Sequence, residues 1–442
     1  MRSWILQTLF DVRYSYWFIP SLMALAAIGL AIGMVSLDVY YLTEIPENYE
    51  WLFRSQPAGA RAILSTVAGS TITVAGVVFS MTIMSVSHAT SNYGSRLLLK
   101  FLKDRRNQIA LGTFIATFIY CLLVLRTVSS AAGGGENATG YDSFVPHLAV
   151  MGALGLALAS VAVLIGFIHH VPDTIHIGSV ASDRGQELVG RLDSMFPEQD
   201  SPQREPVTTV EFTHQVFNHK SGYLQTLDVD GLVAFCAEQN VQARAVKPMG
   251  DFVFEGELLL EFEFDAAMNT IGNDLPTEKQ FRKFFGIGAE RTPSQDTRYL
   301  IEELSQIAVR ALSPGINDPF TAITCIDWLG NAVAHVVNRP AQSAELRDQD
   351  ETVRLFMPLF GFADLADHIF GQLRPYVVND VSTSMHMAKV IVSILSCSNN
   401  ALHEKILHQH AKLYLVESRA ACHSEQDLER LSNSYSFLNK PI

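Results

Sequence analysis

Small and hydroxyl-bearing residues recur at spacings of three and four between residues 65 and 87, which places them on one face of a helix. These residues are Ser65, Gly69, Thr73, Gly76, Ser80 and Ser87, with Met84 among them. A face that met lipid would carry leucine or isoleucine, so we expect this one to meet protein or water. Either the face packs closely against another span, or copies of it from several chains surround a hydroxyl-lined pore.

A second candidate site lies in the C-terminal half, where Arg291, Gln295 and Asp296 form the most polar cluster before a helical stretch. A guanidinium, an amide and a carboxylate at this spacing can bind an ionic ligand. Such residues more often cap a helix and pair across a loop, and we prefer that simpler role here.

Three potential metal ligands, His169, Asp173 and His176, follow the last long apolar run at spacings of four and three. On an uninterrupted helix they would share one face and offer nitrogen and oxygen atoms to a divalent metal. Pro172 is expected to interrupt that helix, and three ligands without a fourth specify little. We therefore predict no metal and no cofactor.

Motifs for catalysis are scarce. The sequence contains no phosphate-binding P-loop, no His-Glu-x-x-His pair and no Gly-x-Ser-x-Gly elbow. Asp318 is a candidate carboxylate, but an N-cap aspartate followed by Pro319 at the first helical position accounts for it. No residue is assigned as catalytic, and a membrane-associated enzyme would depend on Arg291, Asp296 and Asp318 alone.

Four long apolar runs, at residues 17–37, 62–88, 108–126 and 144–168, must position these residues, and only Arg126, which closes the third, carries a charge. About 20 apolar residues rising 1.5 Å each cross a hydrocarbon core of ~30 Å, so each run predicts a transmembrane helix. Because no Asp, Glu, Lys or Arg lies in the interior of these runs, a proton-coupled transporter is disfavoured, whereas a passive pore with a neutral lining is not.

Charge divides the chain into two parts. Residues 1–170 contain 10 Lys or Arg and 8 Asp or Glu, whereas the remaining 272 residues contain 22 and 37. One globular fold is therefore excluded, and the acidic part would repel the phosphates of nucleic acid. The five cysteines are scattered without a Cys-x-x-Cys pair, which indicates reduced thiols.

Basic residues set the expected orientation, because Lys and Arg near span ends stay in the cytoplasm. Five of them lie between the second and third runs: Arg96, Lys100, Lys103, Arg105 and Arg106. The prediction is a multi-pass protein of the bacterial inner membrane with a cytoplasmic N-terminus and C-terminal region. The same basic residues are candidates for binding anionic lipid headgroups.

After the fourth run, the pattern changes to that of an α+β region. Residues 171–206 are expected to form a linker, 207–290 a β-rich module with short strands and a turn at 248–251, and 291–442 a helical bundle. The predicted fold class is thus an α-helical integral membrane protein with four transmembrane helices, followed by a cytoplasmic α+β region.

Four segments resemble a bacterial family of predicted inner-membrane proteins of unknown function, domain of unknown function 2254. They are SYWFIP at 15–20, AILSTVAGS at 62–70, NQ at 107–108 followed by LGTF at 111–114, and ALSPGINDP at 311–319. The resemblance covers nearly the whole chain. It implies a multi-span inner-membrane protein and brings no catalytic residues.

The leading function hypothesis is a homo-oligomeric, channel-like pore lined by the second span and gated or assembled by the cytoplasmic region. The alternative is a membrane-anchored scaffold or sensor, in which the spans only hold a soluble domain that binds a ligand or partner. The two differ in whether polar residues of the second span matter for function or only for folding.

Overall fold

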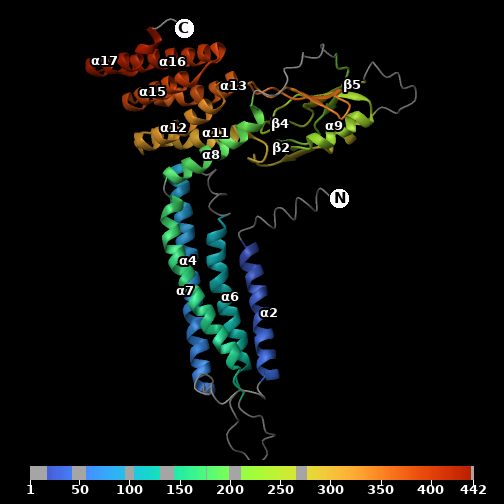
Figure 1. The fold of residues 1–442 in the computed structure, drawn as a ribbon, viewed down its shortest axis with the longest axis vertical. Coiled ribbons are helices and arrows are strands. Elements are labelled where there is room, and N and C mark those ends of the chain that lie inside the picture. Colours follow the sequence, from blue (N-terminus) through green and yellow to red (C-terminus); the bar gives the residue numbers. More distant parts are fainter. Residues whose placement is uncertain are drawn as a thin grey trace, which may run out of the picture. The chain divides into compact units, whose positions relative to one another are not determined.

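The computed structural model describes residues 17–41, 56–94, 104–129, 144–175, 177–198, 211–264 and 276–439. The chain forms two compact units, Met1–His176 and Ile177–Ile442, which are called the membrane unit and the C-terminal unit below. Figure 1 shows the elements of each unit.

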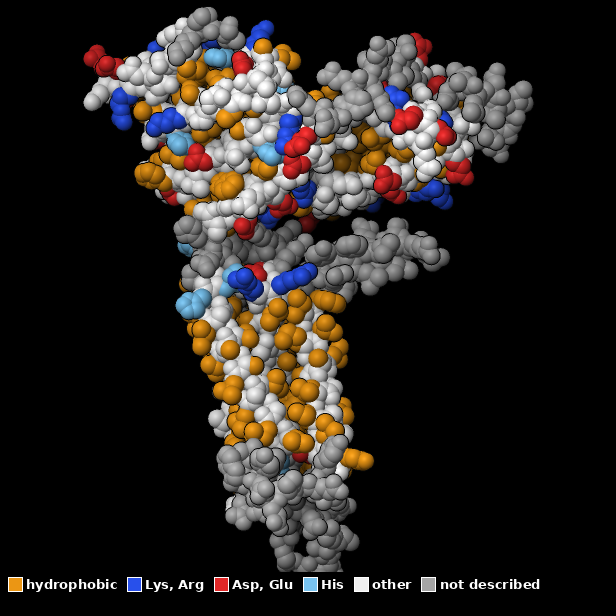
Figure 2. Space-filling view, in the orientation of Figure 1, with side chains coloured by type: hydrophobic (Ala, Val, Ile, Leu, Met, Phe, Trp, Pro, Cys, Tyr) orange, Lys and Arg blue, Asp and Glu red, His pale blue; other side chains and the backbone are white. Residues whose placement is uncertain are grey.

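Four helices that are long and apolar enough to cross a membrane form the described part of the membrane unit, and this confirms the four predicted spans. They are α2 (Phe18–Tyr41), α4 (Pro57–Tyr93), α6 (Arg105–Thr127) and α7 (His147–Ile175). Helix α6 contacts the other three and is the most buried. Hydrophobic side chains cover the outside of these helices, as expected of a surface that faces lipid (Figure 2).

The helices extend beyond the predicted runs, so charged residues lie within their ends, and the expectation of charge-free spans is corrected. Asp38 is buried in α2 and accepts hydrogen bonds from the backbone N–H groups of Leu148 and Ala149, both at 2.9 Å. It thus satisfies two of the free donors in the first turn of α7. Arg61 of α4 donates to the carbonyl of Val128 at 2.8 Å. Each of these two charged side chains therefore forms hydrogen bonds with backbone groups at a helix end.

Short strands form two sheets in the C-terminal unit. The first has the order β1-β5-β3-β8-β7 and the second β4-β2-β6. Their bounds are β1 His214–Phe217, β2 Gly222–Leu227, β3 Val241–Ala245, β4 Phe252–Val253, β5 Leu258–Phe264, β6 Phe285–Gly288, β7 Glu345–Arg347 and β8 Val353–Phe356, with α9 (Val229–Glu238) and α10 (Glu278–Arg282) between them. Strand β8 comes from the predicted helical region and pairs in parallel with β3, so the two expected parts share one sheet.

Helices form the rest of the C-terminal unit, in agreement with the predicted fold class. They are α11 (Thr297–Ala311), α12 (Pro319–Val336), α13 (Phe362–Ala366), the π-helical turn η3 (Asp367–Gly371), α14 (Gln372–Val377), α15 (Val381–Cys397), α16 (Ala401–Ala421), α17 (Glu425–Ser434) and the 3-10 turn η4 (Ser436–Asn439). Asp318 caps α12 by accepting from the backbone N–H of Thr321 at 3.2 Å, with Pro319 at the first helical position. The capping role predicted for Asp318 is confirmed.

The structure differs from the expected linker, because residues 177–195 form helix α8 (Ile177–Met195). Its buried residues include Val180, Leu188 and Leu192, and it packs on α11 and α12. Arg184 reinforces this contact, with its Nε 3.2 Å from the buried carboxylate of Glu303 in α11. Helix α8 therefore belongs to the core of the C-terminal unit.

Candidate functional site

Helix α4 has two faces of different character. One face is buried against the other membrane helices and carries Ala60, Leu64, Ala68, Thr71, Ala75, Val78, Thr82, Val86 and Ala89. These residues recur every three or four positions and are mostly alanine or branched apolar residues, as close helix packing requires. The contacts of α4 within its own chain are thus made by a stripe other than the one predicted from the sequence.

The predicted face lies on the opposite side of α4 and is exposed. Ser65, Gly69, Thr73, Gly76, Ser80 and Ser87 are all solvent-accessible in the protomer. A Cβ atom added at Gly69 or at Gly76 would have no neighbour within 4 Å. No other described span of the same protomer therefore packs on these glycines.

Hydroxyl groups along this face differ in their hydrogen bonds. Ser65 donates to the carbonyl of Ala62 at 3.1 Å, and Thr73 donates to that of Gly69 at 2.8 Å. The hydroxyls of Ser80 and Ser87 make no hydrogen bond to any residue that the structure describes. Both line a hollow of about 640 Å³ together with Ile83, Met84, His88 and other residues of α4.

An unpaired hydroxyl facing hydrocarbon is unfavourable, because it has lost its hydrogen bonds to water. Serine in a membrane helix usually avoids this cost by bonding to its own backbone carbonyls. Ser80 and Ser87 are seven residues apart and so point to the same side of α4. Water, or the same surface on a second copy, would satisfy both hydroxyls.

The basic residues are described only in part. Arg105 and Arg106 are exposed at the start of α6, whereas Arg96, Lys100 and Lys103 lie outside the described residues. Asp104 caps α6 and its second carboxylate oxygen lies 2.7 Å from His170 Nε2, while Arg106 Nη1 lies 3.2 Å from His170 Nδ1. This trio ties the start of α6 to the last turns of α7.

The structure does not bring the weak metal candidates together among its described side chains. Helix α7 continues through Pro172 to Ile175, so the predicted interruption at Pro172 is wrong. His169 is exposed, but the side chain of Asp173 and all of His176 lie outside the described part. In that part, no three His, Cys, Asp or Glu residues are placed to hold a metal ion.

Arg291 and Asp296 meet in an ionic cluster at the start of α11. Asp296 is 2% exposed, and Arg291 Nε donates to its Oδ2. Arg291 Nη1 also donates to both carboxylate oxygens of Glu302, at 2.7 and 2.8 Å. Burial alone would lower the pKa of Arg291, but its hydrogen bonds to Asp296 and Glu302 raise that pKa above its ordinary value. The guanidinium of Arg291 therefore stays charged at any physiological pH.

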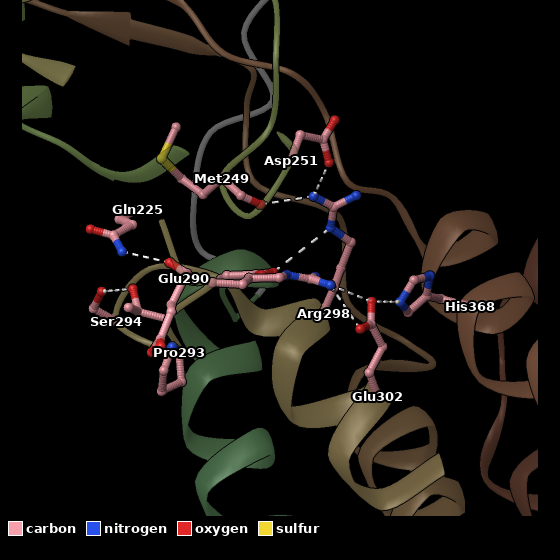
Figure 3. Close-up of polar contacts among 12 residues, drawn as sticks. Gln225, Met249, Asp251, Glu290, Pro293, Ser294, Arg298, Glu302 and His368 are labelled. Carbon is pink, nitrogen blue, oxygen red and sulfur yellow. Dashed lines mark hydrogen bonds and ion pairs between the residues drawn. The ribbon is translucent and has the colours of Figure 1, made fainter. Parts of the chain in front are cut away.

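Residues that the sequence did not single out complete this cluster. Arg298 Nη2 donates to Asp251 at 2.6 Å and to the carbonyl of Met249 at 2.8 Å, and His368 Nε2 lies 3.4 Å from Glu302 (Figure 3). Arg298 and Glu302 follow Arg291 by seven and eleven residues across a loop, and this spacing matches no recognisable sequence motif. Asp251 and His368 come from distant segments and gave no signal.

The predicted cluster also holds the β-sheets to α11. Gln295 accepts from the backbone N–H of Leu227 at 2.7 Å and donates to its carbonyl at 3.1 Å, as a neighbouring strand would. Gly250 has a φ of +91°, and a Cβ there would lie 2.0 Å from Asp296 Oδ2, so only glycine fits this turn. Arg291 and Asp296 thus pair across the loop, as the simpler interpretation expected, but Asp296 occupies the N-cap position of α11 without making a capping hydrogen bond.

A cavity of about 500 Å³ lies beside this cluster. Its walls come from α8, the end of β2, the turn at 248–249, the start of α11, residues 342–346 and residues 357–360. Gln295, Asp296 and Arg298 border it, so two of the three residues predicted to bind an ionic ligand lie at a cavity large enough for a small molecule.

Comparison with known proteins places the chain among uncharacterised membrane proteins. The family model described as a predicted membrane protein, DUF2254, matches residues 13–393. Uncharacterised proteins of Mycobacterium tuberculosis and Mycobacterium bovis are each 33% identical over 360 residues, covering 80% of this chain and 67% of theirs. No solved structure gives a significant match.

Proposed function

Because the chain belongs to the DUF2254 family of predicted membrane proteins, we propose that it works in the bilayer as a homo-oligomeric, channel-like pore. Helix α4 of each copy lines this pore with its exposed face. The observation that carries the proposal is the pair Ser80 and Ser87, whose hydroxyls have no partner among the described residues although they lie in a candidate membrane span. Copies of α4 around a water-filled axis would satisfy both.

Cysteine accessibility in the assembled protein tests this lining. Ser80→Cys and Ser87→Cys, made in a Cys397→Ser/Cys422→Ser background, are expected to lose most of their current in planar bilayers after a charged methanethiosulfonate is added. Leu158→Cys on α7, where Leu158 is 73% exposed, is the lipid-facing control and should not respond. A purified protein that stays silent under voltage, tension and varied ions would contradict the proposal, as would currents that neither serine variant changes.

We further propose that both termini and the C-terminal unit lie in the cytoplasm and that the membrane is the bacterial inner membrane. The positive residues between the second and third spans support this orientation. Arg105 and Arg106, exposed at the start of α6, are then near anionic headgroups, each contributing ~1 kcal/mol of attraction. The C-terminal unit would gate or assemble the pore from that side.

Native cysteines can report this orientation. Cys397 is exposed, whereas burial raises the pKa of both Cys236 and Cys325 to about 12 and keeps their thiols protonated at pH 7.5. We expect a membrane-impermeant maleimide to label Cys397 after lysis but not in intact spheroplasts. A Cys397→Ser/Cys422→Ser variant identifies background labelling, and labelling of Cys397 in intact spheroplasts would place the C-terminal unit outside.

The cavity beside Asp296 favours one other function class, a membrane-anchored scaffold or sensor. In that case the spans only hold the C-terminal unit at the membrane. Ser80→Leu would then change nothing except folding, and the purified protein would carry no current. The accessibility experiment therefore separates the two classes.

A further inference from the structure

We propose that the cavity between α8, the end of β2 and the start of α11 binds a small organic molecule with an apolar body and a hydrogen-bond-accepting head, a carboxylate or a carboxamide. Its volume of about 500 Å³ falls in the usual range for ligand pockets, ~300–1,000 Å³. This inference goes beyond the pore, since it concerns a site in the C-terminal unit alone.

Beside the start of α11, the side-chain hydrogen-bonding group of the lining that remains unused is a donor. Gln295 uses both its amide atoms on Leu227, and Asp296 Oδ1 is enclosed within the protein. Arg298 uses Nη2 for Met249 and Asp251, but its Nη1 has no hydrogen-bond partner among the described residues. Because the acceptors of Gln295 and Asp296 are used or enclosed while a guanidinium donor of Arg298 is left, this part of the lining favours an acceptor on the ligand.

The first turn of α11 adds to this excess of donors. Asp296 occupies the N-cap position, but its side chain makes no capping hydrogen bond. Thr297 and Arg298, the first two helical residues, both border the cavity. The backbone N–H groups at these positions have no partner within an α-helix, and no other described residue accepts from them. They point along the helix axis towards the N-terminal end, where an acceptor head would lie.

The rest of the lining is largely apolar and adaptable. Met195, Met249 and Met357 border the cavity together with Leu227, Val229 and Leu346. Methionine side chains have flexible, polarisable thioethers and pack well against flat or irregular apolar groups. This part of the lining therefore fits the body of an amphiphilic ligand and excludes one that is polar all round.

The charge of the lining limits how much negative charge the head of the ligand can carry. Each arginine of the lining already has a carboxylate partner: Arg298 has Asp251 at 2.6 Å and Arg191 has Glu187 at 3.0 Å. The cavity is thus close to electroneutral, and a polyphosphate would lack counter-charge. A head with one negative charge or none is what these pairs accommodate.

The cavity is lined in part by the helix that follows the last membrane helix in the chain. Helix α8 contributes Arg191, Ser194 and Met195 to the lining. It begins at Ile177, and only His176 separates it from the end of α7. A ligand that holds α8 against β2 and α11 would therefore act on the element that directly follows the fourth span.

Binding of 2-naphthoate to the full chain in lipid nanodiscs tests this inference by calorimetry, with no need for current. We expect 2-naphthoate or 2-naphthamide to bind, and the related ammonium compound, 2-naphthylmethylamine, not to bind. Whichever of 2-naphthoate and 2-naphthamide binds more tightly indicates whether the head of the natural ligand is charged or neutral. Leu346→Trp, which fills the apolar part of the cavity, should abolish binding. Any heat that remains with this variant measures partition of the compound into lipid and is subtracted.

Arg298→Gln should weaken binding by about tenfold or more, the loss of one charge-assisted hydrogen bond. Arg244→Gln removes an arginine paired with Glu261 on the β-sheet and should leave binding unchanged. Should Arg298→Gln unfold, Leu346→Trp decides alone. Binding that is equal in Leu346→Trp and the unmodified chain, equal binding of the ammonium compound, or no binding of either acceptor compound would each overturn the proposal.

Discussion

Replacing Gly185 with leucine is expected to destabilise the C-terminal unit by ~3 kcal/mol, the upper part of the usual range for overpacking. A Cβ at Gly185 would lie 2.4 Å from Cε3 and 2.7 Å from Cδ2 of Trp328 in α12. Both atoms belong to a rigid ring, so the indole cannot yield by a small bond rotation. Either Trp328 or the whole of α8 must move.

Tryptophan fluorescence measures this effect directly, since Trp328 is the only tryptophan after residue 51. Gly190→Leu on the same helix is the matched control, because a Cβ there has no neighbour within 4 Å. That control should gain up to ~0.8 kcal/mol from better helix propensity. Trp328→Ala added to Gly185→Leu should restore part of the lost stability. Equal denaturation midpoints for the Gly185 and Gly190 variants would contradict the prediction.

Contacts along α8 explain why its displacement should matter for more than stability. Besides Arg184 with Glu303, Asp193 lies 2.7 Å from both His335 Nε2 and Arg339 Nη1. Hydrogen bonds from His335 and then Arg339 hold the pKa of Asp193 below its ordinary value. Helix α8 is thus fixed to α11 and α12 at several points. If the C-terminal unit gates the pore, Gly185→Leu should also change the open probability.

Local patterns in the sequence predicted a large share of this fold. The spans follow from charge-free runs, because a membrane helix must be apolar along its length. Asp318 and Pro319 predicted the start of α12, because capping depends on neighbours only three residues away. The ends of the spans were less accurate, since Asp38 looked like a boundary but is buried as a cap for α7.

Long-range pairing accounts for what the sequence did not show. Strand β8 joins β3 across about 110 residues, and neither segment indicates its partner. Helix α8 carries too many charged residues to resemble a core helix, yet its apolar positions Val180, Leu188 and Leu192 are buried. Arg298 and Glu302 belong to the ionic cluster only because helix α11 places Arg298 next to Asp251 and Glu302 next to Arg291. For α4, periodicity grouped the small and hydroxyl-bearing residues on one face but could not tell which face packs inside the protomer.

Replacing Gly76 with leucine is expected to abolish both assembly and current while the protomer still folds. A Cβ at Gly76 or Gly69 meets nothing within 4 Å, so the larger side chain has room in one protomer. Around a narrow pore axis, the exposed faces of neighbouring copies of α4 lie close together, so leucine at Gly76 would hold the helices apart where glycine allows close approach. A loss of ~1.4 kcal/mol per contact already weakens association about tenfold.

Two glycines elsewhere in the membrane unit make this prediction specific. Gly155 on α7 is also exposed with nothing within 4 Å, so Gly155→Leu should keep oligomer and current alike. Gly152 is different, because a Cβ there would lie 2.6 Å from the hydroxyl of Tyr120, which donates to the carbonyl of Ala149 at 2.9 Å. Gly152→Leu should therefore unfold the membrane unit itself. Light scattering in nanodiscs and single-channel recording distinguish the three variants. An oligomer and current retained by Gly76→Leu would mean that α4 meets only lipid, and the unpaired hydroxyls of Ser80 and Ser87 would then need another partner.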